Sequence, residues 1–326
     1  MSLPPKNSFT FALAAEQQER LRAMAAEMRY KTCVVPHTTL AFEGPNCRVN
    51  LYTSGKCLVQ GRGAEDFVLY FLEPVVLQSA GLGYEEVLNP ENFEPHMGSD
   101  ESGKGDFFGP LVTAAAYVDK DLILAMQELG VKDCKLMTDK QTLFIGAKLR
   151  ELLGKERHTV VMMGPEAYNR LYGKFRNVND LLAWAHARCI ENLLETVPDC
   201  PRAVADQFAG EQAIKRALMK KGRKIKLEQR HKAESDMAVA AASVLAREAF
   251  LRGLYKLGDS VAAALPKGAT DVANMGIELV KKHGPSVLAR IAKCHFATTD
   301  RVLAAAGFSR GDLPADARAQ SRSAQK

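Results

Sequence analysis

The sequence predicts an α/β domain with a mixed sheet flanked by helices, preceded by a small α+β module. Short β-rich segments dominate the first part of the chain, whereas strand-like and helix-like segments alternate after Met97. Such alternation is typical of a sheet that helices cover. A stretch rich in Gly, Pro and Asn separates the two parts. The expected organisation is a module at 1–85, a linker at 86–95, a second domain at 96–308 and a disordered tail at 309–326.

The N-terminal module combines helical and strand-like periodicity. Residues 8–29 repeat apolar side chains about every 3.6 positions among good helix formers, which predicts a helix. Turn residues then separate three expected strands, Thr38–Phe42, Arg48–Tyr52 and Cys57–Gln60. A second helix is expected at 64–80.

After Met97 the apolar pattern predicts strands separated by helices. The expected strands are 97–101, 110–118, Thr159–Met163, Arg202–Gln207 and Lys224–Glu228. The expected helices are 120–129, 139–153, Asn179–Thr196 and Glu234–Leu254, followed by further helices to about Ala306.

The composition is that of an ordinary globular protein. The 326 residues are 47% hydrophobic and 25% charged, and the longest uncharged apolar runs are far short of the ~20 residues that a membrane span needs. The start of the chain does not resemble a signal peptide. We therefore expect a cytoplasmic protein that does not enter a membrane, and a monomer, since no stripe suggests oligomerisation.

The cysteines and the charges narrow the function further. Seven cysteines without any C-x-x-C pair disfavour both a zinc site and a disulfide framework. Residues 1–90 carry eight Lys or Arg against nine Asp or Glu, whereas residues 202–232 carry ten against three. This local excess of positive charge is enough to attract a polyanion such as a nucleic acid.

The most informative segment is Met97–Gly109, which reads MGSDESGKGDFFG. Asp100 and Glu101 stand directly before the turn Gly103–Gly105. Carboxylates can hold a divalent cation there, while the bare backbone N–H groups of the glycines approach a phosphate. The segment therefore indicates metal-dependent chemistry on a phosphodiester.

The same segment nearly matches the phosphate-binding loop of nucleotide triphosphatases. Gly98, four residues, and then Gly103-Lys104 fit that loop, but it needs Ser or Thr next to bind Mg²⁺, where this chain has Gly105. The carboxylates within the loop would also repel a triphosphate. A nucleotide triphosphatase is therefore the weaker interpretation.

Further acids stand where metal-dependent catalysis needs them. Asp206 ends an apolar strand-like run, and Glu234 and Asp236 open an Ala-rich helix. If both lay on that helix, Asp236 would point away from Glu234 and would serve only to complement the helix dipole. Asp100 and Glu101 also need a strand that ends or distorts, because consecutive side chains of a regular strand face opposite ways.

A convergence of four carboxylates requires cations, because like charges raise one another's pKa. Two Mg²⁺ ions would convert such a cluster into a device for in-line phosphodiester cleavage. All-oxygen ligands suit Mg²⁺ or Mn²⁺ better than zinc.

Together these segments resemble the type 2 ribonucleases H, and within them ribonuclease HIII. The signature G-x-D-E-x-G-(K/R)-G appears as Gly98–Gly105. Asp206-Gln207-Phe208 matches the strand with the family's third carboxylate, and Lys232–Ser235 with Val239–Arg247 matches the helix with the fourth. Further matching segments are Lys132–Asp139, Asn169–His186 and Lys293–Phe296.

Two features favour ribonuclease HIII over its nearest relatives. The segment Tyr52–Lys56 with Gln60-Gly61 resembles that family's domain similar to TATA-binding protein. Glu234 stands where the related type 2 enzymes usually carry Asp. Cys134 is a departure, since the family normally has Ser there, and it puts that hydroxyl's contact with nucleic acid in doubt.

The resemblance implies a ribonuclease H fold and an endoribonuclease that cleaves the RNA strand of RNA–DNA hybrids, leaving 5′-phosphate and 3′-hydroxyl ends. It implies Mg²⁺ or Mn²⁺ as cofactor, held by Asp100, Glu101 and Asp206, with Glu234 as the fourth catalytic acid. The residues expected to contact nucleic acid are Gly103, Lys104, Gly105, Lys135, Tyr52 and Lys56. The alternatives are an enzyme that prefers single embedded ribonucleotides and a non-catalytic hybrid-binding protein.

Overall fold

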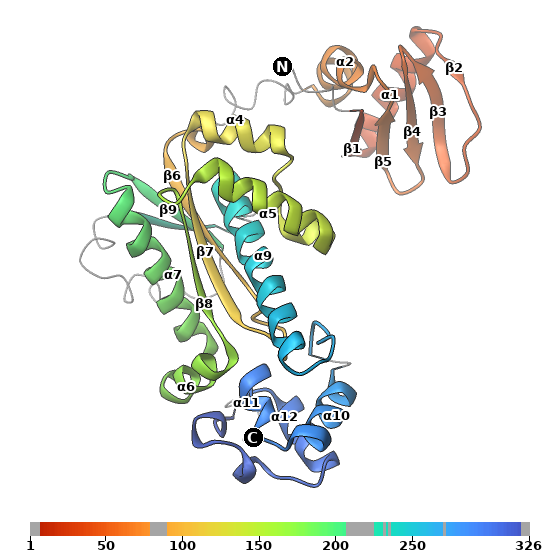
Figure 1. Ribbon diagram of the computed structural model, residues 1–326. Coiled ribbons are helices and arrows are strands. Elements are labelled where there is room, and N and C mark those ends of the chain that lie inside the picture. The colour runs from red at the N-terminus through yellow and green to blue at the C-terminus, as the bar shows by residue number, and fades with distance from the viewer. Residues whose placement is uncertain are drawn as a thin grey trace. The chain divides into compact units, whose positions relative to one another are not determined.

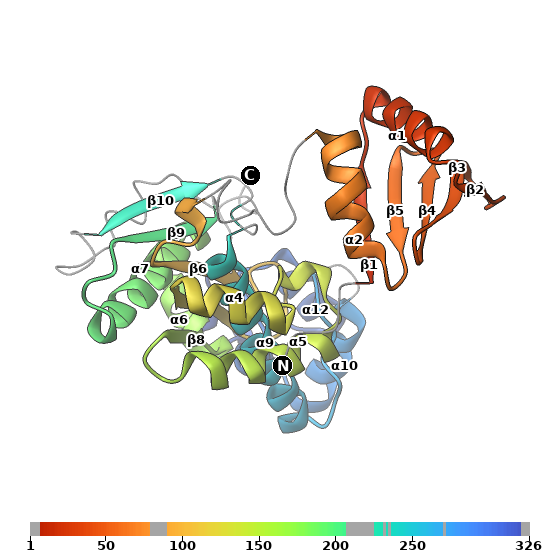
Figure 2. The same ribbon diagram turned by 90° about the horizontal axis from the view of Figure 1, so that it is seen from above.

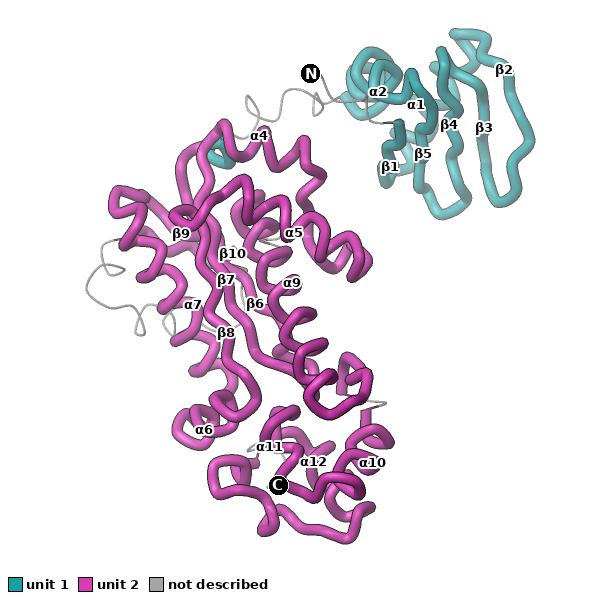
Figure 3. The backbone as a smooth tube through the Cα atoms, in the orientation of Figure 1, with its two compact units in different colours: residues 1–93 teal, residues 94–326 magenta. Residues whose placement is uncertain are grey.

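The structure, a computed structural model, describes residues 7–78, 90–206, 225–230, 233, 236–269 and 272–320. The chain divides into two units, residues 1–93 and 94–326 (Figure 3). The division falls between a module with one antiparallel sheet and a larger part with a mixed sheet.

The N-terminal unit is a five-stranded antiparallel sheet in the order β1-β5-β4-β3-β2. Its strands are β1 (Ser8–Ala12), β2 (Lys31–Thr32), β3 (Thr38–Gly44), β4 (Cys47–Tyr52) and β5 (Lys56–Gln60). The helices are α1 (Ala15–Glu27), α2 (Ala64–Phe67) and the π-helix η1 (Val68–Leu77). Leu21 of α1, Phe42 of the sheet and Leu72 of η1 share one core, so these helices cover one face of the sheet.

The side chains on the other face of this sheet are mostly exposed or half-buried. Along β4 and β5, Val49 and Val59 point into the core, and the side chains that alternate with them are exposed or half-buried, apart from Asn50, which is buried. Tyr52 and Lys56 therefore lie on the outward face together with Arg48. The two residues expected to contact nucleic acid thus share one surface.

One element of this unit differs from the prediction. We expected a single helix at 8–29, but β1 occupies Ser8–Ala12 and pairs with β5, and the helix begins only at Ala15. The helix prediction was wrong at this end because Phe9 is buried between exposed neighbours, which is the period of a strand. The strands expected after Pro36 are confirmed.

The larger unit is built on a mixed sheet in the order β10-β9-β6-β7-β8. Its strands are β6 (His96–Ser102), β7 (Leu111–Val118), β8 (His158–Met163), β9 (Arg202–Asp206) and β10 (Lys226–Arg230). β10, β9 and β6 are parallel, whereas β7 is antiparallel to both β6 and β8. Figure 2 shows β10 beside β9 at one edge of the sheet.

Helices cover both faces of this sheet, as the sequence predicts. The long helices α9 (Met237–Ser260) and α7 (Val178–Thr196) lie on opposite faces (Figure 1). The remaining helices are α4 (Lys120–Leu129), α5 (Asp139–Leu153), α6 (Pro165–Phe175), α10 (Ala273–His283), α11 (Val287–Ile291) and α12 (Ala297–Ala305), with short 3₁₀ turns η2 (Pro90–Asn92), η3 (Cys134–Leu136), η6 (Arg310–Asp312) and η7 (Ala315–Ala317). Within the described ranges, no helix has both the length and the apolar character required to cross a membrane.

The C-terminal segment 309–320 is ordered, contrary to the tail that we expected from Ser309. It contains the turns η6 and η7, and Leu313 and Ala317 are buried. Arg310 holds the segment in place through a two-pronged ion pair with Asp300, at 2.9 and 2.8 Å. The disorder prediction was wrong here because it relied on composition, and a few well-placed apolar side chains suffice for docking.

Candidate active site

Asp100 lies near the end of β6, and its carboxylate faces helix α9. Ser243 of α9 hydrogen-bonds to this carboxylate, and the backbone N–H of Glu101 donates to its Oδ1 at 2.7 Å. Burial, and next the negative charge of Glu101, raise the pKa of Asp100 to about 7. The described groups around Asp100 therefore compensate the negative charge of its ionised carboxylate only poorly.

Glu101 faces helix α7 on the other side of the sheet. The fully buried His186 places Nε2 3.0 Å from Glu101 Oε2 and Nδ1 2.9 Å from Ser99 Oγ. Lys104 Nζ lies 3.6 Å from Glu101 Oε1. Burial tends to raise the pKa of Glu101, but the hydrogen bond and charge of His186, together with Lys104, outweigh it and lower the pKa. Glu101 is thus held in its ionised form.

The two adjacent acids leave β6 on opposite faces. We expected the strand to end or distort at Asp100, so that both acids could face one side. That expectation was wrong: β6 remains paired with β7 through Ser102, opposite Val112, and the glycine turn begins only afterwards. The backbone of the strand therefore stays regular through Glu101. The two carboxylates are nevertheless close to each other, because the charge of Glu101 raises the pKa of Asp100 and the charge of His186 lowers the pKa of both acids.

The backbone of Asp206 lies beside that of Asp100. β9 runs parallel to β6 with Ser99 paired to Ala205, and Asp206 is the next residue and the last of its strand. The side chain of Asp206, all of Glu234 and most of the basic run 202–232 lie outside the described residues. Among the described side chains, no three His, Cys, Asp or Glu residues form a metal-binding group.

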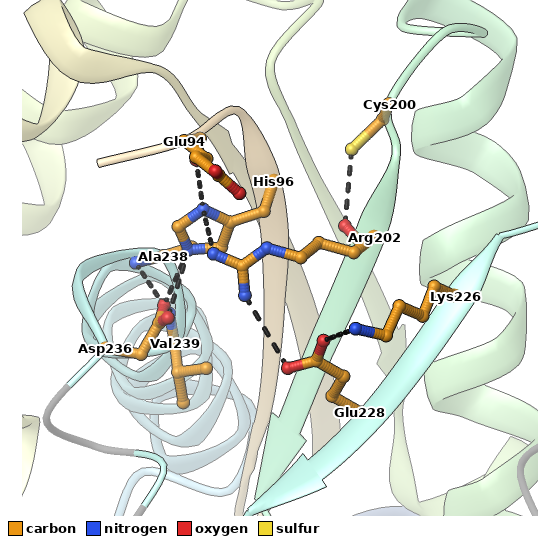
Figure 4. Close-up of polar contacts among 9 residues, drawn as sticks. All are labelled: Glu94, His96, Cys200, Arg202, Lys226, Glu228, Asp236, Ala238 and Val239. Atoms are coloured by element: carbon orange, nitrogen blue, oxygen red, sulfur yellow. Dashed lines mark hydrogen bonds and ion pairs between the residues drawn. The ribbon is translucent and has the colours of Figure 1, made fainter. Parts of the chain in front are cut away.

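Asp236 is the N-cap of α9. Its Oδ1 accepts hydrogen bonds from the backbone N–H groups of Ala238 and Val239, at 2.9 and 3.2 Å, and its Oδ2 lies 3.0 Å from His96 Nε2 (Figure 4). Burial tends to raise the pKa of Asp236, but His96 and the two amides lower it. We expected the helix to begin at Glu234. That was wrong, because Asp236 precedes the first helical residue.

A buried polar cluster ties this helix start to the sheet. Arg202 of β9 places one terminal nitrogen 3.4 Å from His96 Nδ1 and the other 3.7 Å from Glu228 of β10 (Figure 4). His96 itself is fully buried at the start of β6. The N-terminus of α9 is therefore fixed relative to the two strands that carry Asp100 and Asp206.

The glycines of Gly98–Gly105 have different roles. A Cβ on Gly98 would lie 2.3 Å from the backbone of Ala238, so this glycine lets α9 cross directly over β6. Gly103 has φ +87°, and a Cβ there would lie 2.2 Å from the carbonyl oxygen of Pro110. A Cβ on Gly105 would meet no atom within 4 Å. Only Gly105 thus leaves space for a ligand, and Gly98 lies in a strand, which removes the nucleotide-triphosphatase alternative.

A buried lysine anchors the chain just after this turn. Lys293 Nζ donates to the carbonyl oxygens of Phe108, Gly109 and Pro110, at 3.4, 2.8 and 3.4 Å. Complete burial lowers the pKa of Lys293 to about 7. The backbone N–H of Lys293 also donates to Phe107 O. The glycine turn is therefore followed by a segment that is tied to the C-terminal helices.

Cys134 lies next to Asp100 and shares its partner. Ser243 Oγ is 3.0 Å from Cys134 Sγ and 3.3 Å from Asp133 Oδ1. Burial, and also the charge of Asp100, raise the pKa of the Cys134 thiol. Lys135 follows with a side chain that is 70% exposed. The segment that contains Lys135 therefore borders the carboxylate of Asp100 and presents two exposed cations, Lys132 and Lys135.

His186 and Ser243, which hold the two carboxylates, were absent from the residues predicted for the site. Each lies inside a helix and forms no motif of its own. Only the likeness of the segments Asn169–His186 and Val239–Arg247 to family segments pointed toward them. The partner of His186, Glu101, is 85 residues away in the sequence, and the partner of Ser243, Asp100, lies on another element. No local sequence pattern indicates such pairs.

The chain matches known proteins along most of its length. A family model described as ribonuclease HII matches residues 97–299, and a model described as a domain of unknown function matches residues 11–80. The ribonuclease HIII of Protochlamydia amoebophila (strain UWE25) is 38% identical over 307 residues, which cover 94% of this chain and 99% of that protein. The chain belongs to the ribonuclease HIII family. A ribonuclease HIII of Chlamydia caviae is 40% identical over 269 residues, covering 82% of this chain and 87% of that protein.

Solved structures of ribonuclease HIII share the fold. The structure of Bst-RNase HIII in complex with Mn²⁺ has a TM-score of 0.65 at 29% identity, covering 92% of this chain and 99% of that one. The structure of Aquifex aeolicus RNase H3 has a TM-score of 0.51 at 26% identity, covering 87% and 98%. The expected ribonuclease H-like sheet, and an N-terminal domain of the ribonuclease HIII type, are thereby confirmed.

As a ribonuclease HIII, the chain is a type 2 ribonuclease H, an endoribonuclease that hydrolyses RNA in RNA–DNA hybrids. The likenesses favour neither a preference for single embedded ribonucleotides nor a non-catalytic hybrid-binding protein.

Proposed function

We propose that Asp100, Glu101, Asp206 and Glu234 form the catalytic site, and that the first three hold two divalent cations, Mg²⁺ or Mn²⁺. The observation that carries this proposal is the register of β9 on β6, which sets Asp206 level with Asp100, next to Glu101. The carboxyl of Asp100 supports it, because burial beside a second acid raises its pKa to about 7. The relative Bst-RNase HIII was solved in complex with Mn²⁺.

The described residues fit such cations. The donors are oxygen atoms, which Mg²⁺ and Mn²⁺ prefer, and the uncompensated charge at Asp100 is what a cation would neutralise. When bound, the cations supply an activated water and stabilise the leaving oxygen of the scissile phosphodiester.

The protein's own groups hold and orient the reacting parts. His186 keeps Glu101 ionised and fixed, and Ser243 orients Asp100. The open backbone at Gly105 gives a ribose 2′-hydroxyl access to peptide groups, and Lys104 stands beside it for the adjoining phosphate. Lys135 offers a further cation to the backbone.

Side-by-side cleavage of two substrates tests this function. The protein is incubated with a long RNA–DNA hybrid and with a DNA duplex that contains one ribonucleotide, each with Mg²⁺ and with Mn²⁺. We expect cleavage of the hybrid at many positions, with 5′-phosphate ends, and much slower cleavage of the single ribonucleotide. Faster cleavage of the single ribonucleotide would support the alternative enzyme, and hybrid binding in EDTA without any cleavage in Mg²⁺ would support a binding protein.

Alanine substitutions at Gly105 and at Gly103 should differ in their effects: the first should change the KM and the second the stability. Gly105→Ala has room for its methyl group, so we expect normal stability but a raised KM for hybrid, because the methyl occupies the path of the ribose. Gly103→Ala places its Cβ against Pro110 O in a left-handed conformation and should lower the free energy of unfolding by about 2–4 kcal/mol. Thermal unfolding and steady-state kinetics separate the two effects. An unchanged KM for Gly105→Ala would show that the substrate does not approach this turn.

Deletion of residues 1–85 should weaken hybrid binding and leave the chemical step intact. The proposed catalytic acids all lie in the second unit, whereas the outward face of the N-terminal sheet presents Tyr52 and Lys56. We therefore expect a higher KM with nearly unchanged kcat. Lys56→Gln in the full chain is the milder variant, and Glu65→Gln on a helix of the same unit is its control. Equal KM values for deleted and full-length protein across a salt series would contradict this role.

A further inference from the structure

A groove lined by basic side chains runs between α6 and the C-terminal segment 309–320. One part of it, of about 380 Å³, is lined by Arg170, Lys174 and Arg176 from α6 and its end, and by Arg318 from the C-terminal segment. An adjoining part of about 450 Å³ shares Arg170 and adds Arg290. Residues from three regions distant in sequence thus line two adjoining depressions, which share Arg170 and Asp316.

The groove has a rigid wall. The C-terminal segment that forms it is tied down by Arg310, which bonds Asp300 and also donates to the carbonyl oxygens of Cys294 and Ala319, at 2.6 and 3.3 Å. Ala319 packs against the apolar cluster that contains Tyr168 of α6. The spacing of the basic side chains across the groove is therefore set by packed structure on both sides.

The positive charge in the groove is not balanced. Five basic side chains line its two parts against only two acidic ones, Glu166 and Asp316. In the parts of the chain that the structure describes, Arg170, Lys174 and Arg176 make no ion pair. The three are exposed, and Arg176 has φ 55°, a left-handed helix end where Gly or Asn is usual. Such a grouping of like charges favours the approach of an anion.

The groove lies at the end of the sheet where the glycine turn emerges. Met163, the last residue of β8, pairs with Leu111, the first of β7, and α6 begins two residues later. Tyr168 of α6 lies against Lys293, whose amine holds the segment after the turn. Figure 1 shows α6 and α11 together beyond that end of the sheet.

We propose that this groove binds the phosphate backbone of the nucleic acid at a distance from the scissile bond. The inference rests on the proposed catalytic site, because it assumes a duplex that passes the turn Gly103–Gly105. Arginine and lysine side chains held apart on a rigid wall suit successive phosphates, and they would read backbone charge rather than sequence. The groove would thus extend the contact made at the site of cleavage.

The test is the salt dependence of binding, measured in EDTA so that no cleavage occurs. The probes are a long all-DNA duplex and a long RNA–DNA hybrid, each titrated with the full-length protein over a series of salt concentrations. We compare the wild type with the triple variant Arg170→Gln, Lys174→Gln, Arg176→Gln. Because each lost phosphate contact lowers the slope of log K against log salt by about 0.9, we expect a slope lower by about 2–3 for both probes.

A control variant distinguishes binding in the groove from a general effect of losing positive charge at the end of a helix. Lys281 and Lys282 are exposed, stand in the last turn of α10 and do not line the groove. The variant Lys281→Gln, Lys282→Gln should keep a wild-type slope. An equal loss in the control, or an unchanged slope in the groove variant, would overturn the proposal.

A kinetic readout distinguishes this proposal from the proposed catalytic site. The groove variant should retain the wild-type kcat on long hybrid while its KM rises. Loss of kcat with an unchanged slope would speak against the groove and leave the catalytic assignment in place. A wild-type protein that binds duplexes with the expected slope but does not cleave hybrid would instead refute the catalytic site alone.

Discussion

Asp100→Asn is expected to abolish cleavage while hybrid binding in EDTA persists. The substitution removes one of the negative charges that we propose hold the two cations. With it go several kcal/mol of transition-state stabilisation, which is a loss of at least about a thousandfold in kcat. Single-turnover cleavage of hybrid at saturating Mg²⁺ measures the loss. Near-normal turnover by this variant would remove Asp100 from the site.

The same substitution should stabilise the metal-free protein. Because the folded-state pKa of Asp100 is raised to about 7, the folded protein binds a proton there that the unfolded chain releases near pH 3.9. This group therefore lowers the stability of the wild type progressively from about pH 4 to 7. Asn carries no such charge, so the variant should gain on the order of 2–4 kcal/mol over the wild type in EDTA at pH 8 and little at pH 4.

An exposed acid provides the control for both measurements. Asp121 stands in the first turn of α4, away from the β6 acids. Asp121→Asn should leave the rate unchanged and should slightly lower the melting temperature, because it removes only a charge that complements the helix dipole. A stabilisation by Asp121→Asn equal to that of Asp100→Asn would show a general effect of net charge instead of a strained active site.

A substitution of Asp236 should mainly lower stability, whereas a substitution of Glu234 should mainly lower the rate of catalysis. Asp236→Ala removes two amide partners and the partner of His96 at a buried place, so we expect a loss of about 3–5 kcal/mol in the free energy of unfolding. Glu234→Gln should leave the melting temperature unchanged and lower kcat at least about a hundredfold. Thermal unfolding and single-turnover rates, measured on both variants, test the pair.

A milder variant and a pH series keep this prediction testable. Asp236→Asn retains the ability to cap the helix and loses only the charge, so it should fold even if the alanine variant does not. Because the folded-state pKa of Asp236 is lowered, the advantage of the wild type should be complete above pH 3.9 and vanish as the pH falls through the folded-state pKa. A large loss of kcat in a stable Asp236→Asn variant would indicate that Asp236, and not Glu234, is the fourth acid.

The periodicity of apolar residues was sufficient to predict most helices and strands, because it depends only on the local sequence. The helix α5 and the strand β7, for example, lie within a residue of their predicted bounds, since each carries a clear pattern of 3.6 or 2. The edge strand β1 was missed because it is only five residues long and merges into the amphipathic pattern of α1. Short edge strands depend on a partner, here β5, that the local sequence does not reveal.

The candidate site was predictable only in part, for a different reason. Asp100 and Glu101 carry a motif that can be recognised, but the groups that fix their charge states, Ser243 and His186, are brought in by tertiary structure. The start of α9 was predicted at Glu234 instead of Met237, and the acid that caps the helix, Asp236, also contacts His96, 140 residues earlier. Residues of ordinary type at ordinary places acquire a role only through such distant partners.

The two neighbouring acids of β6 are held by different helices and still share one influence. Ser243 of α9 hydrogen-bonds to Asp100 and His186 of α7 hydrogen-bonds to Glu101, but the charge of His186 also lowers the pKa of Asp100. A substitution of Ser243 should therefore change metal affinity through Asp100, whereas a substitution of His186 should change it through both acids. A double-mutant cycle of these two residues should give a coupling energy different from zero. A lineage could thus retune one metal ligand by drift in α9, whereas drift at the buried position in α7 would alter both.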